Sequence, residues 1–232
     1  MAAVDDLIEE IFGDLHPVLR AEFSAWARSS RRFAAFATVY RAKVRAKLRN
    51  ARDEAGLRDV RAELHLAALL LREERFSVEY ERYAASKQRG PDFTVTFRTH
   101  TPFNVEVRRV RLGEAGEDAD ARATRLLGVL VDKVGQLPPS IVNLLWLSAD
   151  APIVADDLAR AVATLGQLAA GQSDDYFMRH GYRGAADFQQ RYRRLSGVVL
   201  PQAEGRVVWP NPLARHKTPP DIATAIARLS LE

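Results

Sequence analysis

GPDFTVTFRTHTPFNVEVRRV, residues 90–110, holds two runs in which apolar and polar residues alternate. Residues 92–97 place phenylalanine and valine on one face, and residues 104–110 do the same with valines. This period of two predicts two β-strands, and the short link between them predicts antiparallel neighbours. A third alternating run at 76–83 precedes them. The simplest arrangement is therefore an antiparallel meander of three strands.

Helical patterns lie on both sides of this meander. Residues 53–74 carry an apolar stripe at helical spacing, and residues 116–137 form a second helix that Pro138 and Pro139 end. Residues 140–147 are almost wholly apolar, as expected for a central strand covered on both faces. The order of helix, three strands, helix and strand predicts an α/β fold with a mixed β-sheet flanked by helices.

Further elements are expected before and after this core. Three N-terminal helices, at 4–15, 17–30 and 31–52, predict a basic helical extension of residues 1–53, and the remaining elements form a second unit, residues 54–232. After the apolar strand we expect helices at 154–170, 174–194 and 219–229, and short strands at 197–200 and 206–209.

Positive charge is concentrated near the N-terminus. The chain has a net charge of +4, yet nine Lys or Arg and no Asp or Glu lie between Arg28 and Arg52. Four arginines recur at helical spacing on one face of the third helix: Arg41, Arg45, Arg49 and Arg52. Such a row suits contacts with nucleic-acid phosphates, which give affinity without reading the sequence. The alternative is a solvated amphipathic helix whose charges pair with acids elsewhere.

Composition argues against several classes of protein. The chain has no Cys, so disulfides and thiolate metal sites are excluded. No apolar run approaches the length of a membrane span, and the N-terminal MAAVDDLIEEIFGDL is acidic and amphipathic, unlike a secretory signal. We therefore expect no membrane partner and a cytoplasmic location.

Two carboxylates in the opening stretch could share a metal ion. Asp92 and Glu106 lie on the polar faces of strands that are expected to pair. Hard divalent ions prefer carboxylate, carbonyl and water oxygens, which Asp92, Glu106 and the Val107 carbonyl would supply. Glu63, on the preceding helix, could add a third carboxylate. The structural alternatives are a turn residue for Asp92, a solvent-facing partner of arginine for Glu106, and a solvated helix residue for Glu63.

The order of these residues resembles the PD-(D/E)xK nuclease superfamily, whose restriction-endonuclease-like core is α-β-β-β-α-β. The resemblance covers about residues 54–147. Pro91-Asp92 matches the Pro-Asp element, and Glu106-Val107-Arg108 lies where the family has acid-x-Lys. Glu63 matches the helix acid that often completes the metal site. The resemblance implies that the acids bind Mg²⁺ (or Mn²⁺) and that a lysine orients or activates the attacking water.

The chain departs from the family at this lysine, because Arg108 stands in its place. Arginine stays protonated, so it can stabilise a phosphate but is a poor proton acceptor. Some members of the superfamily supply the lysine from the following helix. Lys133, close to the apolar face of that helix, is the candidate here.

Together these features predict a metal-dependent nuclease that hydrolyses phosphodiester bonds in DNA. Asp92 and Glu106 would hold the ion with help from Glu63. Lys133 or Arg108 would steady the water or the phosphate. The alternative, which Arg108 favours, is a catalytically degenerate nuclease-fold protein that binds nucleic acid or a protein partner without cleavage. A third interpretation is an α/β scaffold that binds an acidic partner. A homodimer is compatible with the resemblance, because many nucleases of this fold cut as dimers.

Overall fold

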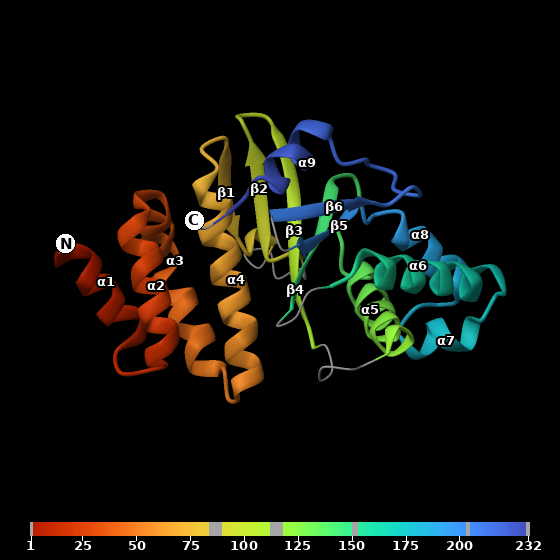
Figure 1. The fold of residues 1–232 in the computed structure, drawn as a ribbon, viewed down its shortest axis with the longest axis horizontal. Coiled ribbons are helices and arrows are strands. Elements are labelled where there is room, and N and C mark those ends of the chain that lie inside the picture. Colours follow the sequence, from red (N-terminus) through yellow and green to blue (C-terminus); the bar gives the residue numbers. More distant parts are fainter. Residues whose placement is uncertain (1, 84–89, 112–117, 150–152, 203–204, 231–232) are drawn as a thin grey trace.

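A mixed β-sheet forms the centre of the protein (Figure 1). The computed structural model describes residues 2–83, 90–111, 118–149, 153–202 and 205–230. Within these residues the sheet has six strands, which lie side by side in chain order. They are β1 Phe76–Tyr80, β2 Phe93–Phe97, β3 Thr101–Val110, β4 Val142–Ala149, β5 Gly197–Gln202 and β6 Gly205–Pro210.

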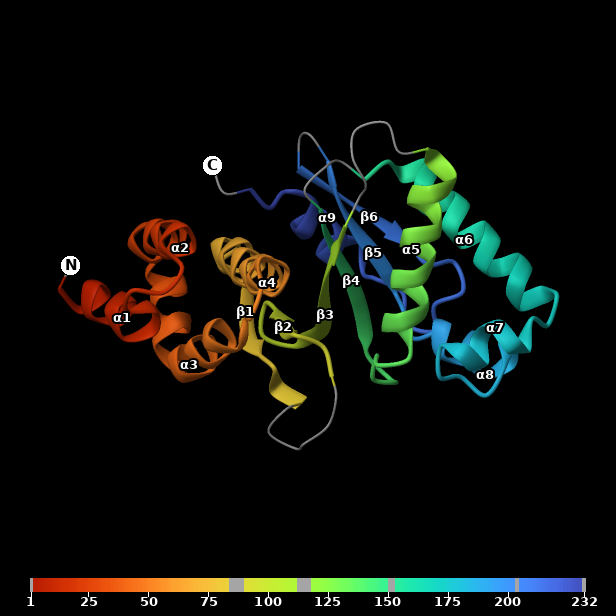
Figure 2. The same cartoon turned by 90° about the horizontal axis from the view of Figure 1, so that it is seen from below.

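Helices cover both faces of this sheet (Figure 2). One side carries α1 Ala2–Phe12, α2 Pro17–Ser29, α3 Arg31–Asn50, α4 Glu54–Arg72 and α9 Pro220–Ala227. The other side carries α5 Ala119–Val134, α6 Ala155–Ala170, α7 Asp174–Arg179 and α8 Ala185–Tyr192. The predicted α/β class with a helix-flanked mixed sheet is therefore confirmed.

The three-stranded meander is also confirmed. In the antiparallel ladders Tyr80 lies opposite Phe93, and Phe93 lies opposite Val105. β3 then pairs in parallel with β4, and α5 makes the crossover that a parallel pair requires. β4 pairs in parallel with β5, and β5 pairs antiparallel with β6.

Two buried apolar clusters fill the spaces between sheet and helices. The first joins the phenylalanines and valines of the meander to α1–α4 and α9, and the second joins α5–α8 to the opposite face. Leu144 belongs to the first cluster and Leu145 to the second, so β4 is the doubly covered strand that its apolar sequence predicts. The helices of residues 1–53 share the first cluster with the sheet.

An aspartate caps the N-terminus of each of the two helices that flank the meander in sequence. Asp53 precedes α4, and its Oδ1 accepts a hydrogen bond of 2.7 Å from the Gly56 N–H. Asp118 precedes α5 and accepts a bond of the same length from the Ala121 N–H. An acidic cap satisfies an otherwise unbonded N–H and suits the positive end of the helix dipole.

The helix expected at 174–194 is in fact two helices, α7 and α8. Gly184 lies between them with a φ of +150°, a conformation that L side chains rarely adopt. A Cβ on Gly184 would lie 2.7 Å from Asp174 Oδ1, and the same oxygen accepts the Ala185 N–H at 2.7 Å. The turn therefore depends on glycine, and it breaks the periodic pattern that predicted one helix.

The apolar strand β4 contains a buried amide that joins several segments. Asn143 is fully buried, and its Oδ1 accepts a bond of 3.0 Å from Asn104 Nδ2 on β3. Its own Nδ2 lies 2.9 Å from the carbonyl of Pro138 and 3.0 Å from the carbonyl of Arg194. One side chain thus satisfies polar groups before and after the strand.

We predict that Asn143→Ala lowers the free energy of unfolding by about 3 kcal/mol, because it leaves several buried polar groups without a partner. Urea denaturation followed by circular dichroism measures this loss. Asn50→Ala, at the exposed end of α3, is the matched control and should change stability by less than about 0.5 kcal/mol. Equal effects of the two substitutions would contradict the role of Asn143.

Candidate functional site

The carboxylates of Asp92 and Glu106 lie where β2 separates from β3. The ladder between these strands ends with Phe93 opposite Val105, whereas β3 continues to Val110 (Figure 1). Beyond that point Asp92 Oδ2 accepts a hydrogen bond of 2.8 Å from the backbone N–H of Val107. The Asp92 carboxylate takes the place of the backbone carbonyl that β2 would offer if the ladder continued. Asp92 is thereby held beside Glu106, so it does more than shape a turn.

Asp92 is surrounded by conditions that disfavour its charge. Burial raises its pKa well above the ordinary value, and the carboxylates of Glu63 and Glu106 raise it further. The Val107 N–H and Lys47 act in the opposite direction but do not outweigh these effects. Glu63 on α4 and Glu106 on β3 therefore both act on Asp92, which directly precedes β2, and the arrangement favours either a proton on Asp92 or a nearby cation.

Glu106 forms a buried ion pair with Lys133. Only 5% of Glu106 is exposed, and Lys133 Nζ on α5 donates to its Oε1. The interpretation of Glu106 as a solvent-facing partner of arginine is wrong, because the side chain lies under α5 instead. The inward direction expected for Lys133 is confirmed. Breaking a buried pair of this kind typically destabilises a protein by about 3–5 kcal/mol.

Glu63 is held by two partners from different elements. Lys47 Nζ on α3 lies 2.5 Å from Glu63 Oε2, and the Tyr80 hydroxyl donates to the same oxygen. Lys47 also lies 2.7 Å from Glu81 Oε1. Burial acts to lower the pKa of Lys47, but Glu63 and Glu81 outweigh it and raise the pKa above the ordinary value. Glu63 is thus an inner acid with a counter-charge and not a solvated helix residue.

Three residues that contact this site, Lys47, Tyr80 and Glu81, were not predicted from the sequence. Glu81 adopts a left-handed φ of +48°, which ends β1 at Tyr80, short of the expected strand end. Its N–H donates to the Asp92 carbonyl at 2.7 Å, so this turn also positions Asp92. The spacing of Lys43 and Lys47 was the available signal, because both lie on one side of α3 and contact Glu81.

The arginine row lies on the opposite side of α3. A helix turns by about 100° per residue, so Arg45 and Arg49 point away from Lys47 and the acids. Arg41 pairs with Glu10 on α1 at 2.9 Å, as the solvated-helix alternative expects. Arg45, Arg49 and Arg52 are exposed. The structure therefore brings together Glu63, Asp92, Glu106 and Lys133 but does not bring the arginine row to them.

A metal ion bound to Glu106 or Glu63 would have to replace the lysine that now pairs with that acid, Lys133 or Lys47. In the described parts of the chain, no three or more His, Cys, Asp or Glu side chains are grouped closely enough to hold a metal. The smaller set of Asp92, Glu106 and the Val107 carbonyl consists of the hard oxygens that Mg²⁺ and Mn²⁺ prefer. Ligation by this set, with help from Glu63, stays a prediction.

Arg108 lies at the border of the cluster. It follows Glu106 by two residues, so both side chains lie on the same face of β3. Its side chain is exposed, and we find no ion pair between it and any residue that the structure describes. A guanidinium in this position can meet an anion that approaches the cluster from solvent.

Comparison of the chain with protein-family models, with curated proteins and with solved structures gave no match. Among the helices that the structure describes, none combines the length and the apolar composition needed to cross a membrane.

The raised pKa of Asp92 predicts a pH-dependent stability in the absence of metal. A folded-state pKa above the unfolded value, about 3.8, stabilises the folded state below that value and loses this effect as pH rises through the folded pKa. Asp92→Asn removes the effect. We expect the variant to unfold at a higher temperature than the parent at pH 8, with a difference that shrinks toward pH 4.

Thermal unfolding in chelator across this pH range measures the difference. For one titrating group, the free energy of unfolding changes by at most about 1.4 kcal/mol per pH unit. Asp6→Asn replaces an exposed acid and is the control, for which we expect no such trend. If the unfolding temperatures of the parent and of Asp92→Asn differed by the same amount at every pH, the raised pKa assigned to Asp92 would be wrong.

Proposed function

We propose that this protein is a Mg²⁺- or Mn²⁺-dependent nuclease that hydrolyses phosphodiester bonds, with DNA as the expected substrate. One observation carries the proposal. Glu63 from α4 and Glu106 from β3 both act on the carboxylate of Asp92, which directly precedes β2, and Lys133 from α5 pairs with Glu106. The elements α4, β1, β2, β3, α5 and β4 also follow the order that the PD-(D/E)xK resemblance implies. We infer a restriction-endonuclease-like core from this order.

Asp92 is suited to bind a divalent cation. Its carboxylate accepts the Val107 N–H, but burial and two neighbouring acids raise its pKa. A cation relieves this repulsion and would displace the proton, so metal affinity should increase with pH. Glu106 and the Val107 carbonyl would complete the protein ligands. A bound ion of this kind lowers the pKa of its water and stabilises charge that develops on a phosphate.

Lys133 and Arg108 would then have separate roles. Lys133 is largely buried against Glu106, and its ammonium can donate to a water held near that carboxylate. Arg108 is exposed two residues further along β3, where its guanidinium can bind a phosphate oxygen. With these separate roles, Lys133 from α5 would position the water in place of the motif lysine, which is replaced by Arg108.

A second candidate function is nucleic-acid binding without cleavage. The specific observation that favours it is that lysines already neutralise the acids: Lys133 pairs with Glu106, and Lys47 pairs with Glu63. Such pairs can hold a nuclease-like cluster together with no ion bound. Arg108 in the lysine position also favours this candidate.

A cleavage assay tests the first candidate. We expect the parent protein to nick supercoiled plasmid DNA with Mg²⁺ or Mn²⁺ and to be inactive in chelator. Asp92→Asn and Glu106→Gln should abolish cleavage. Lys133→Ala should reduce the rate by about 10²–10⁴-fold, as is typical for one positioned catalytic group. Arg108→Ala should have a smaller effect, and the exposed Asp6→Asn should have none.

Thermal unfolding with and without Mn²⁺ separates the two candidates. Metal binding stabilises the native state, by about 2.7 kcal/mol at one hundred times the dissociation constant, and Asp92→Asn should remove this gain. A parent that binds DNA but neither cuts it nor responds to Mn²⁺ supports the second candidate. Cleavage that persists in chelator, or without both Asp92 and Glu106, would rule out the metal mechanism.

A further inference from the structure

A groove opens beside the cluster, between the end of β3 and α5. Its volume is about 440 Å³. Side chains from β3, from α5 and from α4 line it, and four of them are arginines: Arg108, Arg109, Arg111 and Arg125. The groove is therefore a concave and basic surface next to the buried acids.

The acids that line the groove are already engaged. Asp59 Oδ1 lies 2.9 Å from Arg109 Nε, and that arginine side chain is only 6% exposed. Asp132 Oδ1 lies 3.1 Å from His180 Nδ1. Arg108 and Arg111 are exposed, and neither pairs with an acid in the described part of the chain. Four arginines and two acids line the groove, so its net charge is positive and suits an anion.

A glycine on α5 leaves the groove open along that helix. Gly128 lies in the interior of the helix, where glycine destabilises relative to alanine. No heavy atom lies within 4 Å of the position that a Cβ would take, so packing within the protein does not require glycine. The residue lines the groove. An absent side chain at this point lets a ligand approach the helix backbone closely.

The groove adjoins the acids, whereas the arginine row of α3 does not. Arg108 and Glu106 lie about 7 Å apart along the same face of β3. Asp132, which lines the groove, directly precedes Lys133. The row of Arg45 and Arg49 faces away from Lys47 and so from the cluster.

We propose that this groove binds the phosphate backbone of a nucleic-acid strand. Arg108 and Arg111 contact successive phosphates, and Gly128 lets the strand lie against α5. The strand then passes Glu106 and Lys133, which brings a phosphodiester to the cluster. Contacts of this type are independent of base sequence. The inference rests on the proposed function for the nature of the anion and adds the surface that holds it.

Binding measured in chelator tests the groove without cleavage. Fluorescence anisotropy of labelled duplex DNA, single-stranded DNA and single-stranded RNA, titrated with salt, gives affinity and its salt dependence. The variant with both Arg108→Ala and Arg111→Ala should bind roughly tenfold or more weakly, and the slope of log affinity against log salt should fall by about one per arginine. The strongest of the three ligands identifies the strand type.

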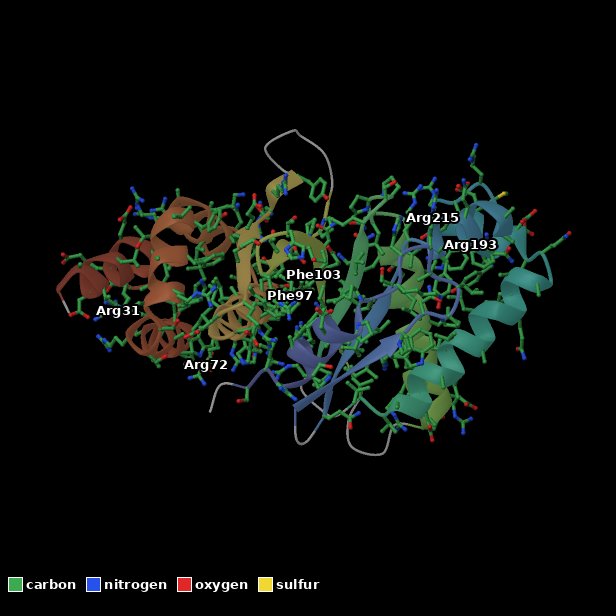
Figure 3. The ribbon with its side chains drawn as sticks, turned by 90° about the horizontal axis from the view of Figure 1, so that it is seen from above. Arg31, Arg72, Phe97, Phe103, Arg193 and Arg215 are labelled. Atoms are coloured by element: carbon green, nitrogen blue, oxygen red, sulfur yellow. The ribbon has the colours of Figure 1, made fainter. Side chains whose placement is uncertain are left out.

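Two matched pairs of substitutions serve as comparisons. Arg193 and Arg215 are exposed and lie side by side near α8 (Figure 3). Their joint replacement by alanine should leave affinity and salt slope unchanged. Joint replacement of Arg45 and Arg49 should change them less than loss of the groove arginines.

Gly128→Ala separates binding from stability. Alanine favours the helix, so the melting temperature should rise by about 2–4 °C, while the added methyl group should weaken binding. Gly166 on α6 likewise has no heavy atom within 4 Å of a Cβ position. Gly166→Ala is the control and should gain stability without loss of binding.

The outcomes distinguish the groove from the nuclease. If the double arginine variant loses binding but the parent never cuts, the groove stands and the proposed catalysis fails. If the parent cuts and the groove variants bind and cut equally well, the groove is wrong and the catalysis stands. Full competition by millimolar inorganic phosphate, or a dominant effect of Arg45 and Arg49, would also overturn the groove as a strand-binding surface.

Discussion

The hydrogen bond from the Val107 N–H to Asp92 governs the whole candidate site. It forms where β2 leaves β3, and the carboxylate takes the place of the backbone acceptor that the ladder no longer provides. The side chain is therefore fixed by the geometry of the sheet. Its partners, Glu63 and Glu106, approach from a helix and a strand whose positions the same sheet sets. Lys47 and Lys133 supply a positive charge to Glu63 and to Glu106, whereas the carboxylate of Asp92 has only the Val107 N–H as its hydrogen-bond donor among the described residues.

Local patterns in the sequence predicted much of this arrangement. Alternation over residues 92–110 gave the paired strands, and the position of Lys133 near the apolar stripe of α5 gave its inward direction. The features that the sequence did not predict depend on long-range contacts or on the backbone angles of single residues. Lys47 reaches Glu63 from another helix, and no spacing rule links residues that only tertiary packing brings together. The early end of β1 and the break before α8 depend on the backbone angles of Glu81 and Gly184, which periodicity does not encode.

The two sides of α3 show why a count of charges is a poor guide to binding surfaces. The sequence shows one basic segment without acids, yet its lysines and arginines have different surroundings. Lys43 and Lys47 face the interior and neutralise Glu81 and Glu63. Arg45 and Arg49 face solvent, and Arg41 pairs with Glu10 on α1. Part of the basic character of the segment is thus used within the protein, and a second basic surface lies on α5 and at the end of β3, where residues 108–111 carry three arginines.

Lys47 also has a consequence for how the chain could be shortened. The N-terminal helices could be taken for an appendage that a smaller version of the protein can lose. They supply part of the apolar cover of the sheet, and through Lys47 they supply the counter-charge of Glu63. A truncated chain beginning at residue 54 would leave that acid with Tyr80 as its hydrogen-bond partner and closer to solvent. Truncation would also remove Lys47, which acts to lower the pKa of Asp92, so the chain is best engineered as one unit.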